Sequence, residues 1–221
     1  MKPLIRLKNL LRKNQLDAYI ISKCDMFFSE EVLPHQERLK YITNFSGSSG
    51  FAVVLSKSNK KSAIFSDGRY KIQIEQEVDK NDFNFINGGL LAISDFIILN
   101  NKNIKNIAFD PSLISIKDFE NLSKNLKNKS FKLIKINENL VDKVWSNKPN
   151  IPENNIYNLP IKYSGKKSLV KISELLKEIN SVNSKAYFLS QPDSLSWLLN
   201  VRDSQLKYSP VFRALAIVRN D

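Results

Sequence analysis

The stretch IFSDGRYKIQIE, residues 64–75, places an arginine at the corner between an apolar run and a segment of helical periodicity. The guanidinium of Arg69 carries five N–H donors in one plane and stays charged at physiological pH, so it can fork onto a carboxylate or onto carbonyl oxygens. Asp67 and Gly68 predict a stiff turn, with Asp67 placed to cap the following helix. Two interpretations stay open: Arg69 contacts a ligand outside its domain, or it forms an ion pair within the domain.

Other residues that could carry chemistry give weaker signals. His35 is the single histidine, which removes multi-histidine zinc sites and leaves one partner for a nucleophile. Cys24 could pair with it as a thiolate, but a structural cysteine and a loop histidine are favoured because nothing in the sequence orients the imidazole. The loop FSGSSGF, residues 45–51, lacks the glycine spacing of phosphate-binding loops and favours a tight turn with close backbone approach. The residues alone identify no catalytic centre.

Composition bounds the class of protein. The 221 residues are 42% hydrophobic and carry a formal net charge of +12, but the lysines are scattered among asparagines and arginine is sparse. This pattern favours a compositional bias over a nucleic-acid-binding surface. A single cysteine is typical of a reducing compartment, and no apolar run approaches the ~18 residues that span a bilayer. The opening segment lacks the apolar core and cleavage site of a secretory signal. We therefore expect a cytoplasmic protein with neither nucleic acid nor membrane as partner.

Strands and helices alternate over residues 1–146. Leu4, Leu7 and Leu11 recur at helical spacing and predict an opening helix, with Pro3 tolerated in its first turn. We predict strands at 17–22, 50–56, 61–66, 83–87, 106–110 and 131–136, with a hairpin turn at 57–61. We predict further helices at 69–78, 90–100, 116–128 (capped by Ser115) and 138–145. This alternation indicates an α/β domain with a largely covered sheet.

A second alternation follows a proline-rich segment. Pro149, Pro152 and Pro160 exclude a continuous helix or central strand, so residues 147–160 are predicted to be a linker. Beyond it we predict a helix at 164–180, a strand at 186–190, a helix at 192–200 and a strand at 210–218. The predicted buried face of the first of these helices consists of Leu169, Ile172, Leu176 and Ile179. These elements are too few to close a layered core, so we expect an incomplete second domain over 161–221.

Seven segments, taken in order, resemble the N-terminal portion of cytosolic-type, three-domain Xaa-Pro aminopeptidases of the creatinase/prolidase group. They are DAYIIS, SEEVLPHQERLKYITNFSGSSGFAVVL, AIFSDGRYKIQIEQEV, FDPSLIS, ENLVDKVW, LSWLLNVRDSQLKYSPVF and ALAIV. The resemblance covers essentially the whole chain, and the segments keep the family's order and spacing.

The resemblance implies a fold and an activity. It implies a creatinase N-terminal-like domain over residues 1–146, with a mixed sheet flanked by helices, and the start of a similar domain over 161–221. In the family a further, pita-bread domain holds two divalent metal ions, usually manganese, and releases an N-terminal residue that precedes proline. Its ligands are two aspartates, a histidine and two glutamates, and none of them maps onto this sequence. We therefore assign no metal ligand and no catalytic residue, and we expect the chain alone to be inactive.

The resemblance also implies a substrate contact. In the family the arginine of the DGRY corner reaches the mouth of the catalytic site and contacts the peptide, which makes Arg69 a substrate-binding residue. Arg202 matches an arginine after Trp-Leu-x-Asn and is interpreted as a packing or interdomain residue, with Asp203 standing where glycine is common. His35 departs from the family pattern and receives no role.

The implied partners are a peptide with proline in second position, the chain's own C-terminal catalytic domain, and a second copy in a homodimer. The implied function is a non-catalytic region that shapes the active-site mouth. The alternative is a stand-alone protein- or peptide-binding module of the same fold without catalysis. Retention of SDGRY, residues 66–70, favours the peptidase.

Overall fold

A computed structural model describes residues 1–221 with the exception of 58, 101, 103, 128–129, 154 and 220–221. The chain forms two compact units, residues 1–150 and 151–221, and each is described by itself. In the described part of the chain, no helix has both the length and the apolar character needed to cross a bilayer.

The first unit is built on a six-stranded mixed sheet in the order β4-β3-β2-β1-β5-β6. Its strands are β1 (Ala18–Ser22), β2 (Phe51–Leu55), β3 (Ser62–Ser66), β4 (Phe83–Asn87), β5 (Asn106–Phe109) and β6 (Lys132–Lys135). β2 runs antiparallel to both β1 and β3, whereas β3–β4, β1–β5 and β5–β6 are parallel pairs. All strands except β2 therefore end at the same edge of the sheet.

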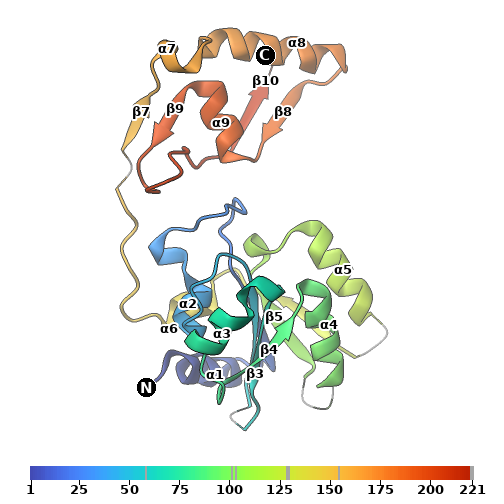
Figure 1. Cartoon of the computed structure of the whole chain (residues 1–221). Helices are drawn as coiled ribbons and strands as arrows, with labels where there is room; N and C mark the ends of the chain where they lie inside the picture. Colours follow the sequence, from blue (N-terminus) through green and yellow to red (C-terminus); the bar gives the residue numbers. More distant parts are fainter. Residues whose placement is uncertain (58, 101, 103, 128–129, 154, 220–221) are drawn as a thin grey trace. The chain divides into compact units, whose positions relative to one another are not determined.

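Helices cover both faces of this sheet (Figure 1). They are α1 (Pro3–Lys13), α2 (Arg38–Thr43), α3 (Lys71–Glu77), α4 (Leu90–Leu99), α5 (Ile116–Leu126) and α6 (Leu140–Val144), with 3₁₀ turns η1 (Pro34–Gln36), η2 (Gly68–Tyr70) and η4 (Pro111–Leu113). One core lies between the sheet and α1, α2, α3 and α6; the other lies between the sheet and α4 and α5. The α/β fold with a mixed sheet flanked by helices is confirmed.

Alternation along the strands divides the side chains between the two cores. In β1 every residue is buried; Tyr19 and Ile21 belong to the first core, and Ile20 belongs to the second. Successive side chains of a strand point to opposite faces, so a strand covered on both faces is apolar throughout.

Local signals from the sequence also hold. Leu4, Leu7 and Leu11 form the buried face of α1, with Pro3 in its first turn, and the Ser115 side chain accepts from the backbone N–H of Asp118 as the cap of α5. The hairpin partners β2 and β3 pair as predicted, although Ser58 in the turn lies outside the described residues, as does residue 128 at the end of the expected α5.

The second unit contains two small antiparallel sheets, β7–β9 and β8–β10. Its elements are β7 (Ile156–Asn158), α7 (Ile161–Ser164), α8 (Ser168–Ser181), β8 (Ala186–Leu189), α9 (Pro192–Leu199), β9 (Val201–Asp203) and β10 (Ala216–Arg219). Its small core consists of Leu189, Leu195 and Leu198, with partly buried neighbours from α8 and β10.

The second unit departs from expectation in several places, and its elements α7 and β9 were not predicted. The range expected as a linker contains β7, because the three residues between Pro152 and Pro160 that pair with β9 include no proline. Of the four residues of the predicted buried face of α8, Ile172, Leu176 and Ile179 are buried or half-buried, whereas Leu169 is 76% exposed; Lys171 is buried although it was not predicted. The strand expected over 210–218 begins only at Ala216 and runs to Arg219.

Candidate functional site

The DGRY corner lies directly after β3, at the edge of the sheet where five of its six strands end. β2 begins at this edge because it runs the opposite way, so the glycine-containing loop over residues 45–50 arrives beside the corner. Sheet topology thus brings together two segments that are about twenty residues apart in the chain.

Asp67 and Arg69 form a bidentate ion pair. The Nε and Nη2 atoms of Arg69 donate to the two carboxylate oxygens of Asp67, each at 2.9 Å, and the backbone N–H of Arg69 donates to Asp67 Oδ1 at 3.0 Å. The Arg69 side chain is nevertheless 77% exposed. The ion pair considered from the sequence therefore forms, and it engages one edge of an outward-facing guanidinium. Asp67 caps the turn η2, while α3 begins only at Lys71.

The pair is ionised on both sides. Hydrogen bonds from the Arg69 side chain lower the pKa of Asp67 to about 2, and the same carboxylate raises the pKa of Arg69. At neutral pH the corner therefore presents a compensated pair, not an isolated positive charge.

Tyr70 anchors the corner to the loop. Its ring meets Phe45 edge-on at a centroid distance of 5.6 Å, and its hydroxyl lies 2.7 Å from Ser48 Oγ. The Arg69 guanidinium carbon lies 5.5 Å from the centre of the Tyr70 ring. A Cβ on Gly47 would come within 2.6 Å of the Phe45 ring and 2.8 Å of the Tyr70 ring. The loop therefore packs so closely under the corner that only glycine fits there.

A second set of bonds fixes the loop to α3. Glu77 accepts from the backbone N–H and from the hydroxyl of Ser46, both at 2.7 Å, and Gln73 joins the same cluster. Burial acts to raise the pKa of Glu77, but these hydrogen bonds outweigh it and the pKa is lowered. The Glu77 carboxylate thus occupies the Ser46 backbone N–H, a donor that a bound phosphate would need. In the same loop, a Cβ on Gly50 would lie 2.9 Å from the Phe65 carbonyl oxygen. The close backbone approach expected for this loop is confirmed at Gly50, while the chain bends at Ser48 and Ser49.

The remaining candidates from the sequence, Cys24 and His35, are half-buried and buried. The Cys24 thiol lies 2.7 Å from Ser22 Oγ and 3.3 Å from the Leu113 carbonyl oxygen, and burial raises its pKa to about 11. His35 is buried at the turn η1. The described residues contain no group of three His, Cys, Asp or Glu side chains that could hold a metal ion.

Arg202 has a structural role within the second unit. Its Nη1 donates to the carbonyl oxygens of Ser196 at 3.0 Å and Val201 at 2.8 Å. It joins the end of α9 to β9, which fits the packing role expected from the sequence. Asp203 is buried and has no left-handed backbone, so the turn there places no demand for glycine.

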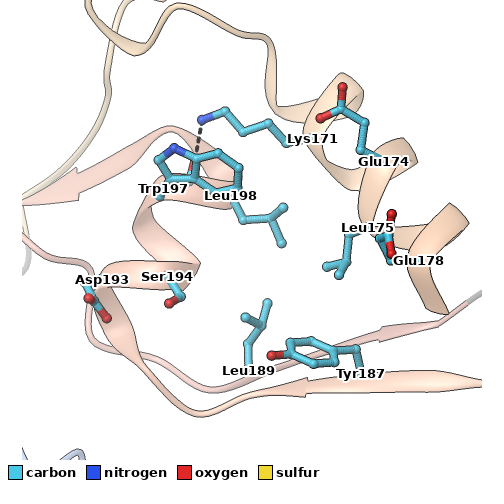
Figure 2. A pocket seen from close by; sticks show the side chains of 10 residues that line it. All are labelled: Lys171, Glu174, Leu175, Glu178, Tyr187, Leu189, Asp193, Ser194, Trp197 and Leu198. Atoms are coloured by element: carbon cyan, nitrogen blue, oxygen red, sulfur yellow. Dashed lines mark hydrogen bonds between the residues drawn. The ribbon is translucent and has the colours of Figure 1, made fainter. Parts of the chain in front are cut away.

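Sequence reasoning missed a cavity of about 490 Å³ in the second unit. Figure 2 shows the ten residues that line it: Lys171, Glu174, Leu175, Glu178, Tyr187, Leu189, Asp193, Ser194, Trp197 and Leu198. Lys171 lies 4.2 Å from the centre of the Trp197 ring and donates to the Trp197 carbonyl and to Asn200 Oδ1, both at 2.6 Å. Burial lowers the pKa of this lysine. No local sequence pattern encodes such a cavity, because its walls come from α8, β8 and α9.

The chain matches known proteins over its whole length. Family models described as Creatinase/Prolidase N-terminal domain match residues 4–144 and residues 147–221. A probable Xaa-Pro aminopeptidase P of Laccaria bicolor is 35% identical over 99% of this chain, and one of Coprinopsis cinerea is 34% identical over 100%. The chain spans about a third of the length of these relatives, 34% and 35%.

Solved structures support the same fold. The X-prolyl aminopeptidase of Caenorhabditis elegans, described as a cytosolic enzyme with a di-nuclear active site, superposes with a TM-score of 0.87 at 24% identity. That likeness covers 99% of this chain and 37% of the nematode chain. The N-terminal domain of the cytoplasmic peptidase PepQ of Mycobacterium tuberculosis gives a TM-score of 0.52 at 18% identity, over 64% of this chain and 97% of that domain.

Proposed function

Because the chain belongs to the creatinase/prolidase N-terminal domain family, we propose that it is the non-catalytic, amino-terminal region of a metal-dependent Xaa-Pro aminopeptidase. Such an enzyme releases the N-terminal residue of a peptide whose second residue is proline. The region shapes the mouth of the active site, and Arg69 contacts the peptide there. The observation that carries this proposal is the exposed Arg69 guanidinium at the end of β3. The loop over residues 45–50 packs against this corner so closely that only glycine fits at position 47.

The chemistry itself belongs to a catalytic domain with two divalent metal ions, for which we propose manganese. The residues of this chain do not fit such a centre, because among those described no three potential ligands come together. We therefore place no reaction step on this chain. We propose that the enzyme works in the cytoplasm and that its partners are the peptide, the catalytic domain of the same protein and a second copy in a homodimer.

The part of Arg69 is to bind and orient the peptide. Of the five donors that a guanidinium offers, two are used by Asp67, and the side chain that carries the other three is 77% exposed. Donors fixed before the ligand arrives lose little conformational entropy on binding, which strengthens the binding of the peptide.

The test compares Arg69→Ala with wild type in the protein as its gene encodes it, with manganese and a peptide that begins Ala-Pro. We expect KM to rise about tenfold with little change in kcat, because a charge-assisted hydrogen bond to substrate is lost. Lys71→Ala is the matched control, since it removes an exposed positive charge two residues away. Unchanged kinetics in Arg69→Ala, or robust hydrolysis by the 221-residue chain alone, would contradict the proposal.

A binding module without catalysis is the second candidate. The observation that favours it is the exposure of large apolar side chains in the second unit, where Trp197 is 54% and Phe188 57% exposed. Contiguous apolar surface is typical of interaction sites, and Trp197 lines the cavity of this unit together with Leu175, Leu189 and Leu198. One stoichiometric protein partner in a pull-down, from a gene whose reading frame encodes no catalytic domain, would support this candidate over the peptidase.

A further inference from the structure

The Asp67 carboxylate already occupies one edge of the Arg69 guanidinium. This edge, formed by Nε and Nη2, is one of the two edges at which a guanidinium binds a carboxylate through two parallel hydrogen bonds. A peptide must therefore use the other edge, which consists of Nη1 and the remaining hydrogen of Nη2. The ligand meets a guanidinium whose charge is compensated by a carboxylate on its far side.

A ligand carboxylate is a poor competitor for the occupied edge. Asp67 accepts three hydrogen bonds from Arg69, one of them from the backbone, and its pKa of about 2 keeps it ionised wherever the protein works. A ligand carboxylate that displaced Asp67 would break both hydrogen bonds between the two side chains. It would form only equivalent hydrogen bonds with Arg69 in their place. We infer that Asp67 stays in place when a peptide binds.

The open edge discriminates between ligands. A ligand carboxylate at the open edge would lie on the opposite side of the same guanidinium from Asp67. The two negative charges would repel each other, and only one positive charge would compensate both. A neutral carbonyl oxygen accepts the same hydrogen bonds without that repulsion. Resting on the function proposed above, we propose that Arg69 recognises backbone carbonyl groups of the peptide and not its C-terminal carboxylate, and that Asp67 is the positioning residue that sets this preference.

The test uses pairs of peptides that differ only at their end: Ala-Pro-Ala, its tetrapeptide and its pentapeptide, each as free acid and as C-terminal amide. The ratio of kcat/KM for acid over amide is measured in the protein as its gene encodes it, at the length where Arg69→Ala has its largest effect. We expect a ratio within about twofold of one in wild type. We expect Asp67→Asn to raise the ratio about fivefold, because the uncompensated guanidinium then gains a charge-assisted bond at a solvent-exposed site.

Asp67→Asn keeps the fold of the corner, since asparagine also accepts from the backbone N–H at a cap. Asp79→Asn is the matched control. Asp79 is another exposed aspartate that accepts from a backbone N–H two residues on and pairs with a cation, Lys2, at 2.9 Å. The Asp79→Asn substitution makes the same change in net charge away from the corner. We expect it to leave the acid-to-amide ratio of kcat/KM unchanged.

The outcomes separate the two proposals. If Arg69→Ala leaves kcat/KM unchanged for both peptides of every pair, the proposed substrate contact is wrong, and the proposed preference is wrong as well. If Arg69→Ala impairs both forms but wild type favours the acid several-fold, only the preference is overturned. It is overturned as well if Asp67→Asn leaves the ratio near one, or if Asp79→Asn raises it equally. A wild-type ratio near one that rises in Asp67→Asn alone supports the inference.

Discussion

Gly47→Ala is the substitution that best tests how the loop supports the DGRY corner. The added Cβ would lie 2.6 Å from a Phe45 ring atom and 2.8 Å from a Tyr70 ring atom. Phe45 is fully buried, so its ring cannot swing into solvent, and the loop or the corner must move. Overpacking of this kind costs about 1–3 kcal/mol. Replacing glycine also restricts the unfolded chain, which returns about 0.4–1 kcal/mol.

We therefore expect a net loss of about 1–2 kcal/mol in the free energy of unfolding of the first unit. For a unit of about 150 residues this lowers Tm by roughly 2–8 °C. The chain has two tryptophans, Trp145 in the first unit and Trp197 in the second. In a Trp197→Phe background, Trp145 fluorescence in a urea titration reports the first unit alone.

Gly68→Ala is the matched control. A Cβ at Gly68 would meet no atom within 4 Å, and the backbone there does not require glycine. We expect this variant to be as stable as wild type or up to about 1 kcal/mol more stable. The packing argument is refuted if Gly47→Ala unfolds at the same urea concentration as wild type, or if Gly68→Ala is the more damaging of the two.

Further predictions concern three buried or half-buried groups. Burial acts to raise the pKa of Asp142, but its hydrogen bonds, led by those from Arg38, outweigh burial and lower the pKa. Its stabilising contribution is therefore complete above the ordinary carboxyl pKa near 4 and is lost as pH falls through the lower, folded value. Arg38→Ala should cost about 1.5–3 kcal/mol at pH 7 and less at pH 3, a difference that urea titrations at both values would reveal. The Cys24 thiol, with a pKa of about 11, should react with iodoacetamide at pH 7.5 roughly 100-fold more slowly than a free cysteine, and comparable rates would show that it is not shielded. Lys171→Met should cost the second unit about 1–3 kcal/mol, because the Trp197 carbonyl loses its donor, and Trp197 fluorescence would report it.

The sequence predicts those features that depend on neighbours along the chain. The face of α1, the Ser115 cap and the fully buried β1 follow from periodicity and from capping chemistry, which act within a few residues. The close approach at Gly47 and Gly50 also follows, because paired glycines before a strand are typical of a tight turn.

Features that depend on tertiary neighbours escape such reasoning. The predicted face of α8 includes Leu169, in the first turn of the helix, because helical spacing indicates a face but not where along the helix the core begins. Lys171 is buried there because a carbonyl and an amide oxygen accept from its ammonium group. At the candidate site, spacing predicts the cap made by Asp67 but leaves the destination of the Arg69 guanidinium open, since a bidentate pair depends on rotamers that the spacing does not fix.

Two strands of similar sequence show this limit most clearly. β1 reads AYIIS and β8 reads AYFL, and both follow an amphipathic helix. β1 has a strand on each side and helices on both faces, and all its residues are buried. Among the described residues β8 pairs with β10 alone, and Phe188 is 57% exposed. A local pattern thus predicts the strand, whereas the layers around it decide how much each side chain contributes to stability.

Matched truncations in the two strands measure that difference. Ile20→Ala, at 3% exposure, should cost the first unit about 2–5 kcal/mol, because it removes buried methyl groups and leaves a cavity. Phe188→Ala removes a larger side chain but should cost the second unit less than about 1 kcal/mol, because little of its ring is withdrawn from water. Urea titrations give both values when they are followed by Trp145 in a Trp197→Phe background for the first variant and by Trp197 in a Trp145→Phe background for the second. A cost for Phe188→Ala as large as that for Ile20→Ala would mean that its ring is covered in solution, and the exposed face of β8 would then have a partner.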